Sequence, residues 1–324
     1  MDPFGRIVDY LRISITDRCN ERCLYCMPEG YHGWAQRPDH LTGAEIVEVV
    51  RAAAGLGFRK FRLTGGEPLV RADVPQIAAG MAAIPGVEAI GLSTNGTRLA
   101  PVAQSLRDAG VRTVNISLDA LDPEVYRRIT GGDVAQVLAG IRAAVAAGFE
   151  RIKLNVVLLR GMNEAELWPI VQFGAEHGLP VRFIELMPLS RTDVLNDANF
   201  LPVSEVMAKL AERDELVPQP DRRLGHGPAK YYQFKHSGAL VGFIGAITNQ
   251  HFCESCNRVR LTADGKIRPC LGNHGEVDLR TALRKHASEA ELAELLRSAV
   301  AQKPEAHIFR ENYTPCRPMV AIGG

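Results

Sequence analysis

Residues 8–26 read VDYLRISITDRCNERCLYC, a short β-rich run followed directly by three cysteines. Cys19, Cys23 and Cys26 form a Cys-x3-Cys-x2-Cys pattern, and the sequence offers no obvious fourth thiol beside them. A loop with thiolates at this spacing can give one sulfur to each of three irons in a four-iron cluster. The fourth iron would then be open to a ligand that does not come from the protein.

A zinc site is the alternative for the same loop, with His32 as the fourth ligand. Structural zinc usually joins two ligand pairs, such as two Cys-x2-Cys units or a Cys-x2-Cys unit and a histidine pair. The spacing therefore favours an iron–sulfur cluster but leaves zinc open.

The unit of a β-rich run followed by an amphipathic helix repeats along the first 190 residues. We expect strands at 8–15, 58–64, 87–94, 111–118, 151–159 and 181–187. The first helical stretch begins with Thr42 and has Glu45 three residues later, a pair typical of a capping box. Six such units predict a parallel sheet with right-handed crossovers. Because a TIM barrel needs eight units, we predict an α/β fold with a partial, TIM-like (β/α)6 barrel.

The pattern changes near residue 195. The sequence then predicts one helix, a stretch rich in proline and glycine, several strands, a hairpin around Asp264-Gly265 and two short helices. We therefore predict two regions, a partial barrel at 1–195 and a smaller α+β extension at 196–324.

The composition is that of an ordinary globular protein, with 46% hydrophobic and 23% charged residues. Lys plus Arg is 38 and Asp plus Glu is 37, so no global charge attracts nucleic acid or an anionic membrane. We see no signal peptide and no apolar run long enough to span a bilayer. We expect a cytoplasmic protein that binds neither nucleic acid nor membrane, with cysteines that serve as ligands rather than disulfides.

A second cysteine group lies in the extension. Cys253, Cys256 and Cys270 again supply three sulfurs, as Cys-x2-Cys, thirteen residues and a further Cys. A Cys3His zinc site with His274 stays open here, and with it a zinc-binding protein without catalysis. Cys316 fits no ligand spacing, and we interpret it as a structural or surface residue.

Several stretches resemble a known superfamily. The run CNERCLYC, with Tyr25 as its aromatic residue, resembles the signature of radical S-adenosylmethionine (radical SAM) enzymes, and TGGEPL at 64–69 resembles their second signature. CNRVRLTADGKIRPCL at 256–271, GPAKYYQF at 227–234 and the final IGG make the chain similar to one family of these enzymes, the GTP 3′,8-cyclases. This likeness covers nearly the whole chain.

The resemblance implies two [4Fe–4S] clusters, each held by three cysteines and each with an open iron. The first would bind S-adenosylmethionine as cosubstrate, and the second would bind the purine of GTP. A 5′-deoxyadenosyl radical would take the ribose 3′ hydrogen, giving (8S)-3′,8-cyclo-7,8-dihydroguanosine 5′-triphosphate, a step of molybdenum cofactor biosynthesis. The resemblance also implies a homodimer, an external electron donor, and transfer of the product to cyclic pyranopterin monophosphate synthase. A peptide-modifying radical SAM maturase with an auxiliary cluster is the alternative, although such auxiliary domains usually carry more cysteines.

The resemblance also assigns residues. S-Adenosylmethionine would contact Tyr25, Gly66, Ser117 and Met187, and GTP would contact Arg12, Arg62, Ser93, Lys153, Arg258, Val259 and Arg260. The family usually has threonine at the position of Ser93, and serine keeps the hydroxyl. Guanidinium groups suit phosphate oxygens because they pair with them in a bidentate way. Arg12, Arg62 and Lys153 fall inside expected parallel strands, so either they point into a polar lumen or the strand ends are misplaced.

Simpler interpretations remain for some of these residues. Met187 could be core packing, and the Ser117 hydroxyl could bond to nearby backbone. Asn95-Gly96 could be only a turn, and Asp119 could be a site residue or a helix cap. The resemblance implies that the tail, with Gly323 and Gly324, reaches the active site and assists radical initiation, whereas a frayed terminus is the plain alternative.

Overall fold

The computed structural model describes residues 1–27, 30–31, 39–190, 192, 196, 198–222, 224–311 and 313–323. Its first part holds six parallel strands, β1 (Tyr10–Ser14), β2 (Lys60–Thr64), β3 (Ala89–Thr94), β4 (Val111–Ser117), β5 (Arg151–Leu158) and β6 (Val181–Glu185). All six predicted strands are present, and they pair in chain order. The predicted α/β class with a partial six-unit barrel is confirmed.

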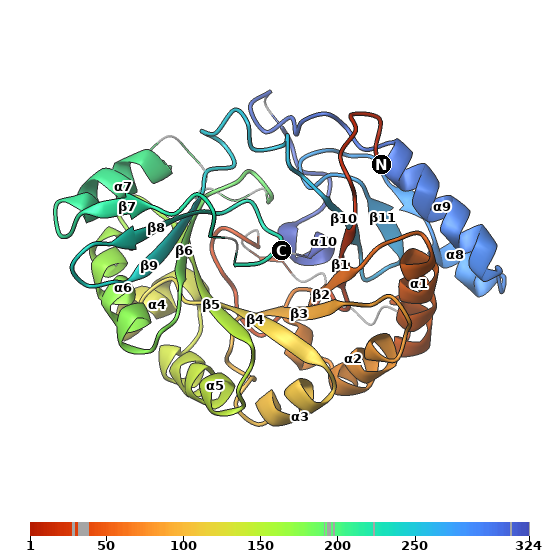
Figure 1. Ribbon diagram of the computed structural model, residues 1–324, viewed down its shortest axis with the longest axis horizontal. Helices are drawn as coiled ribbons and strands as arrows, with labels where there is room; N and C mark the ends of the chain where they lie inside the picture. The colour runs from red at the N-terminus through yellow and green to blue at the C-terminus, as the bar shows by residue number, and fades with distance from the viewer. Residues whose placement is uncertain are drawn as a thin grey trace.

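Helices follow these strands and cover the outer face of the curved sheet (Figure 1). They are α1 (Gly43–Gly55), α2 (Val74–Ala82), α3 (Ala103–Asp108), α4 (Pro123–Thr130), α5 (Val134–Ala146) and α6 (Leu167–Glu176), with short 3-10 turns η1 (Pro68–Val70) and η2 (Glu164–Glu166). The predicted capping box is present at α1, where the Thr42 hydroxyl accepts from the Glu45 N–H and the Glu45 carboxylate accepts from the Thr42 N–H.

The helix α4 was not predicted. Its start is specified by Asp122, whose side chain accepts from the N–H groups of Glu124 and Val125, and by Pro123 in the first turn. Its end is specified by Gly131 in the left-handed conformation. These capping signals are present in the sequence. The helix is only eight residues long and follows β4 closely, so its apolar pattern is too short to indicate a helix.

The rest of the chain extends the same sheet at both edges. It contains α7 (Val203–Ala211), β7 (Leu216–Pro218), β8 (Lys230–Phe234), β9 (Leu240–Ile244), β10 (Arg258–Leu261), β11 (Lys266–Arg268), β12 (Val277–Asp278), α8 (Arg280–Arg284), α9 (Glu289–Ala301) and α10 (Met319–Ile322). The predicted hairpin is β10–β11, and the two predicted short helices are α8 and α9. β9 pairs in parallel with β6, and β10 pairs in parallel with β1.

The described strands thus form one twelve-stranded sheet in the order β12-β11-β10-β1-β2-β3-β4-β5-β6-β9-β8-β7. Because strands from beyond residue 195 join both edges, the two predicted regions share a single sheet. The boundary at residue 195 stays a prediction about the organisation of the chain.

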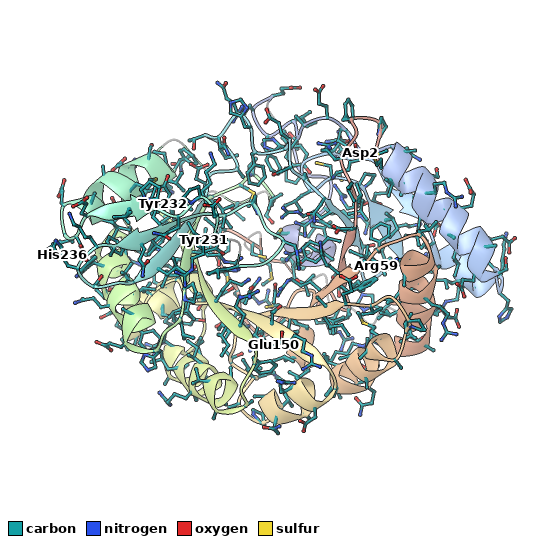
Figure 2. All side chains as sticks on the ribbon, viewed as in Figure 1. Asp2, Arg59, Glu150, Tyr231, Tyr232 and His236 are labelled. Carbon is teal, nitrogen blue, oxygen red and sulfur yellow. The ribbon has the colours of Figure 1, made fainter. Side chains whose placement is uncertain are left out.

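The main core lies between the sheet and the outer helices. Alternate strand residues such as Leu11, Ile13, Phe61 and Leu63 are fully buried in this layer. Figure 2 shows the side chains packed between the ribbon of the sheet and the helices around it. The intervening residues of the same strands are polar and point to the inner side. Within the described ranges, no helix has both the length and the apolar character needed to cross a membrane.

Candidate active site

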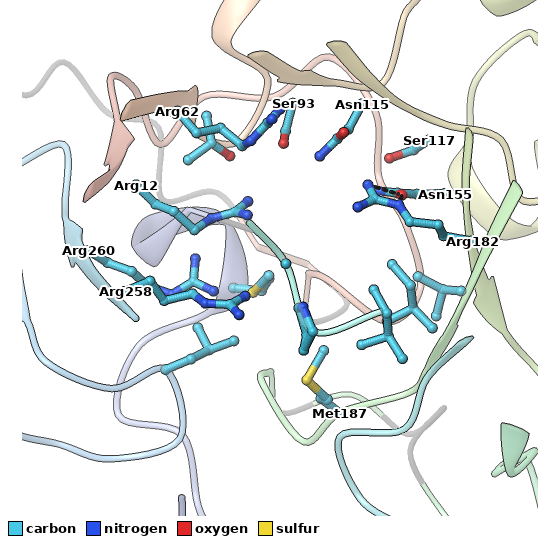
Figure 3. Close-up of a pocket in the computed structure, with 18 of the residues that line it drawn as sticks. Arg12, Arg62, Ser93, Asn115, Ser117, Asn155, Arg182, Met187, Arg258 and Arg260 are labelled. Carbon is cyan, nitrogen blue, oxygen red and sulfur yellow. Dashed lines mark hydrogen bonds between the residues drawn. The ribbon is translucent and has the colours of Figure 1, made fainter. Parts of the chain in front are cut away.

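A cavity of about 370 Å³ lies on the inner side of the sheet. This volume is within the range of roughly 300–1,000 Å³ that small-molecule sites usually have. Its walls come from the barrel strands, from β10, from both cysteine groups and from the start of α10. Figure 3 shows Arg12, Arg258 and Arg260 on one side of this space and Asn155 with Arg182 on the other.

The first cysteine group lies in the loop after β1. Cys19, Cys23 and Cys26 are free and half-buried, and all three line the cavity. The loop is fixed to α4 by backbone bonds from Arg22 N–H to Thr130 and from Leu24 N–H to Ile129. Burial raises the pKa of all three thiols, that of Cys26 to about 12. Thiolates in such a place require a bound cation, and iron supplies one.

The second cysteine group lies at the opposite end of β1. Because Tyr10 at the start of β1 pairs with Arg258 at the start of β10, Cys256 lies near the beginning of β1. β11 runs antiparallel to β10 and leads to Cys270 on the same side. The two cysteine groups therefore lie beyond opposite ends of β1, and both line the same cavity.

The second group has a different electrostatic setting. Burial alone would raise the pKa of Cys256, but Arg258 and Lys303 outweigh it and lower that pKa to about 7. For Cys253 and Cys270, burial dominates and raises the pKa. Three thiols that line a cavity, one of them easily ionised, are a donor set that fits an iron–sulfur cluster with an open coordination position.

The zinc alternatives gain no support. His274 is exposed, stacks on Tyr313 and is absent from the cavity wall, and His32 lies outside the described residues. In the described part of the chain, no three histidine, cysteine or acidic side chains converge at distances suited to one metal ion. A four-iron cluster does not need such convergence, because its three thiolates bind three different irons.

The four residues predicted for S-adenosylmethionine, Tyr25, Gly66, Ser117 and Met187, all line the cavity. The Tyr25 hydroxyl donates to Asp119 Oδ2 at 2.6 Å, and the Val157 N–H donates to Asp119 Oδ1 at 2.8 Å. Asp119 therefore belongs to the cavity wall, and Asp122 is the cap of α4. Burial raises the pKa of Asp119 to about 6, although both hydrogen bonds lower it.

The second signature forms a tight junction between loops. A side chain at Gly66 would collide with the Arg18 carbonyl and with Val320 of α10. Glu67 is buried and accepts from the Thr94 hydroxyl and from the N–H groups of Asn95 and Leu69. Burial raises the pKa of Glu67 to about 7 despite these bonds. The Asn95-Gly96 turn is thereby tied to the loop after β2.

The predicted GTP residues also line the cavity, with one exception. Arg12, Arg62, Ser93, Lys153, Arg258 and Arg260 face it, which confirms a polar lumen as the place of the charged strand residues. Val259 is 1% exposed and packs in the hydrophobic core, because neighbouring residues on β10 point to opposite faces. The predicted roles in binding remain predictions.

Guanidinium groups form a row across three strands. Arg12 pairs in register with Arg260 on one side and with Arg62 on the other. Arg62 donates to the Tyr10 hydroxyl, the Leu92 carbonyl and the Thr113 hydroxyl, and it crosses β3 at Gly91, where a side chain would collide with it.

Burial, with Arg62 and Arg258 as neighbours, lowers the pKa of Arg12 to about 10. Like charges opposite one another are destabilising, so this row favours a polyanionic ligand.

Sequence reasoning missed other cations of the same cavity. Among the described residues, nine lysines and arginines line it against two carboxylates, Glu21 and Asp119. Lys60, Arg151, Arg182 and Lys303 were not predicted. Arg182 is 7% exposed and donates from Nε and Nη2 to Asn155 Oδ1 at 2.9 and 2.6 Å. The alternation of Arg151, Lys153 and Asn155 along β5 was the signal for Asn155, and a charge inside the otherwise apolar start of β6 was the signal for Arg182.

The tail enters the barrel. Val320 and Ile322 are buried, and their helix α10 lies near the centre of Figure 1. The Met319 N–H donates to Ser190 Oγ at 2.9 Å, and Ser190 Oγ donates to the Cys26 carbonyl. The α10 helix is thus anchored on the first cysteine group.

The described end of the tail reaches the guanidinium row. Arg260 Nη1 donates to the Gly323 carbonyl at 2.5 Å. Gly323 has a φ of 76°, and an added Cβ would lie 2.9 Å from Ser14 Cβ, so this position requires glycine. Gly324 lies outside the described residues.

Cys316 is exposed, with its sulfur 3.7 Å from Arg268 Nη1, in accord with a surface position.

Comparisons with known proteins agree with this geometry. A model of the radical SAM superfamily matches residues 13–174, and a model described as Molybdenum Cofactor Synthesis C matches residues 179–309. Curated relatives named GTP 3′,8-cyclase from Moorella thermoacetica and Pelotomaculum thermopropionicum are each 45% identical over 100% of this chain and 99% of their own. One from Hydrogenovibrio crunogenus is 42% identical with the same coverage.

Solved structures share the fold. Streptococcus suis SuiB bound to S-adenosylmethionine matches 86% of this chain and 65% of its own with a TM-score of 0.62 and 13% identity. HydG, a maturase of the [FeFe]-hydrogenase, matches 64% of this chain and 49% of its own with a TM-score of 0.51 and 14% identity. At these identities the likeness concerns the fold alone.

Proposed function

The chain belongs to the radical SAM superfamily and, within it, to the GTP 3′,8-cyclase family, and from this premise we propose how its cavity works. It is a radical SAM enzyme of molybdenum cofactor biosynthesis. We propose that it converts GTP to (8S)-3′,8-cyclo-7,8-dihydroguanosine 5′-triphosphate. The observation that carries the proposal is one cavity with a three-cysteine group beyond each end of β1 and a row of guanidinium groups between them.

The donor sets assign the cofactors of the family to residues of this chain. Cys19, Cys23 and Cys26 would hold one [4Fe–4S] cluster, and Cys253, Cys256 and Cys270 would hold the other. With S-adenosylmethionine, the first cluster supplies the 5′-deoxyadenosyl radical that removes the 3′ hydrogen of GTP. All six cysteines line the cavity, so a cluster on either group would have three thiolate ligands and one iron left for a ligand that is not a cysteine.

The remaining residues bind and orient. Arg12, Arg62, Lys153, Arg258 and Arg260 offer charge and N–H donors for the triphosphate and the purine, with Ser93 and the backbone of Val259 beside them. Arg62 is held by three hydrogen bonds, so it is oriented before a ligand arrives. A polyanion offsets the mutual repulsion of these cations, which gives it an advantage over neutral ligands.

A second set would hold S-adenosylmethionine at the other end of the cavity. Asp119 fixes the Tyr25 hydroxyl, and Ser117 and Met187 extend from the ends of β4 and β6. Gly66 lets the backbone approach closely because its surroundings exclude a side chain. Gly323 and Gly324 are proposed to assist radical initiation, with the Gly323 carbonyl held by Arg260.

The activity is tested with anaerobically purified, reduced enzyme given S-adenosylmethionine and GTP. We expect 5′-deoxyadenosine and the cyclised nucleotide by liquid chromatography and mass spectrometry. Cys270→Ala should abolish the cyclised product, whereas Cys316→Ala, a change at an exposed cysteine, should leave it. The absence of a GTP-dependent cyclised product in the wild type would favour the peptide-modifying alternative.

Iron content tests the two cofactor sites separately. We expect about eight irons per chain in the wild type and about four in Cys253→Ala, because each cluster contributes four. Inductively coupled plasma analysis with a sulfide assay gives the counts. A wild type with about four irons and an unchanged Cys253→Ala would contradict the second site.

We further propose partners that the cavity alone does not define. The enzyme is expected to form a homodimer, to receive electrons from an external donor, and to pass its product to cyclic pyranopterin monophosphate synthase. Light scattering on anaerobic protein measures the first of these, and a coupled assay with the next enzyme measures the last.

A further inference from the structure

Lys303 is a buried lysine at the second cysteine group. It follows α9, is 3% exposed and lines the cavity. Its Nζ donates to the carbonyls of Arg258 and Pro269, each at 2.9 Å. Arg258 comes two residues after Cys256, and Pro269 comes directly before Cys270. The ammonium therefore joins the two separate stretches of chain that carry this group.

The same ammonium acts on the thiols themselves. The charge of Lys303 acts on all three thiols, and at each of them it lowers the pKa. Among the residues that the structure describes, no carboxylate forms an ion pair with Lys303. Arg258 also acts on Cys256, and its charge has the same sign as that of Lys303.

A buried ammonium of this kind requires a negative partner. Lysine is almost never fully buried unless it is paired, because removing the charge from water is costly. Three thiolates on a [4Fe–4S] core carry a net negative charge, which increases by one unit when the core gains an electron. A cluster on these three cysteines would supply that counter-charge. Net charge and hydrogen bonds to sulfur are among the factors that set the potentials of such clusters.

We propose that Lys303 is a positioning residue that raises the reduction potential of the second cluster through a charge that its two carbonyl bonds hold beside the three cysteines. The inference rests on the proposed function, which places a cluster on Cys253, Cys256 and Cys270. A positive charge beside the sulfurs stabilises the reduced form more than the oxidised form, because the reduced form is more negative. Loss of the charge should therefore lower the potential.

The test isolates the second cluster in the full-length chain. Cys19, Cys23 and Cys26 are replaced by alanine, and the parent should hold about four irons. Its potential is measured by titration with dithionite and mediators, followed by electron paramagnetic resonance. In Lys303→Met we expect reduction to be at least tenfold less favourable, a shift of about 59 mV to lower potential for one electron. Lys303→Arg, which keeps the charge, should stay near the parent.

Lys303→Gln separates charge from structure. Glutamine keeps neutral N–H donors for the two carbonyls but removes the charge, so the potential should fall as in Lys303→Met. A purely structural role would leave the glutamine variant at the potential of the parent. Lys266→Met is the matched control, because Lys266 on β11 is neutralised by Asp278 at 2.5 Å and should not affect the potential.

Each failure has its own signature. A parent without four irons contradicts the proposed second cluster and therefore the proposed function. A parent with its cluster, but with unshifted potentials in Lys303→Met and Lys303→Gln, overturns the role of Lys303 and leaves the proposed function intact. Loss of the cluster in both neutral variants but not in Lys303→Arg supports a required charge, and loss in all three variants overturns it.

Discussion

Lys153 shows how the cavity changes the chemistry of a single side chain. It is 3% exposed on β5, and its Nζ donates to the Leu224 carbonyl. Burial, followed by the charges of Arg182 and Arg62, lowers its pKa to about 6. In the free enzyme near neutral pH, most Lys153 side chains are therefore uncharged. A lysine in this state can gain a proton when an anion enters.

This shift predicts a pH dependence of GTP binding. A bound triphosphate favours the charged form and raises the Lys153 pKa, so binding takes up a proton above pH about 6. The affinity of the wild type should then fall as pH rises to about 8, by up to tenfold per unit. Titration calorimetry of wild type and Lys153→Met gives the two slopes. The variant should bind more weakly and with a flatter slope, and equal slopes would contradict the assignment.

At the residue scale, the sequence predicts which side chains face the cavity better than it predicts the electrostatic environment that they meet there. Arg12, Arg62 and Lys153 were expected in a polar lumen, and the structure places them there. Arg182 has the same signal, a charge inside an apolar strand, but was missed. The depressed pKa of Lys153 could not be predicted, because Arg62 and Arg182 approach it only when strands distant in the chain are assembled.

The short helix α4 links element structure to the first cysteine group. Backbone bonds from Arg22 and Leu24 end on its last turn, and the Tyr126 hydroxyl donates to the buried Glu21 at 2.8 Å. Glu21 lies between Cys19 and Cys23 in the chain. The geometry of the cysteine loop therefore depends on its bonds to α4, a helix from a separate segment of the chain.

Removal of the α4 cap should weaken this element. Asp122 Oδ1 accepts two N–H bonds at 2.9 Å, so Asp122→Ala should lower the free energy of unfolding by about 1 kcal/mol. Urea denaturation of the metal-free chain provides the measurement. Asp221→Ala, at an exposed turn position, is the control with no expected change. An equal decrease in the free energy of unfolding of both variants would contradict a specific role for the Asp122 cap.

At the element scale, local periodicity predicted the strands and most helices correctly. It failed for α4, where eight residues give too short a pattern and the capping signals had to be read alone. It also gave no means of placing β9 beside β6 or β10 beside β1. Strand pairing over such separations depends on the assembled sheet rather than on any local sequence signal.

At the scale of the molecule, the tail joins the first cysteine group to the guanidinium row. The α10 helix bonds to Ser190, which in turn bonds to the Cys26 carbonyl, and the Gly323 carbonyl accepts from Arg260 of the guanidinium row. The tail through Gly323 is thus a packed part of the site, so the alternative of a frayed terminus does not hold for these described residues. The position and role of Gly324 remain predictions.

Deletion of Gly323 and Gly324 should separate catalysis from cofactor assembly. The change removes a hydrogen bond to a charged group, worth about 1.5–3 kcal/mol, so turnover should fall by about tenfold or more. Iron content should remain at about eight per chain, since no cysteine is affected. Turnover is measured as cyclised product and as 5′-deoxyadenosine. Normal turnover in the deletion variant would dismiss a role for the tail.

The pairing of β1 with β10 has a consequence for synthesis on the ribosome. Tyr10 and its partner Arg258 are separated by most of the chain. At about 5–20 residues per second, the nascent β1 waits on the order of ten to fifty seconds before its second neighbour has been made. During that time one edge of β1 exposes unpaired N–H and C=O groups, which can pair with other chains. Fragments that stop before β10 should therefore aggregate, and nascent chains should need protection until translation is nearly complete.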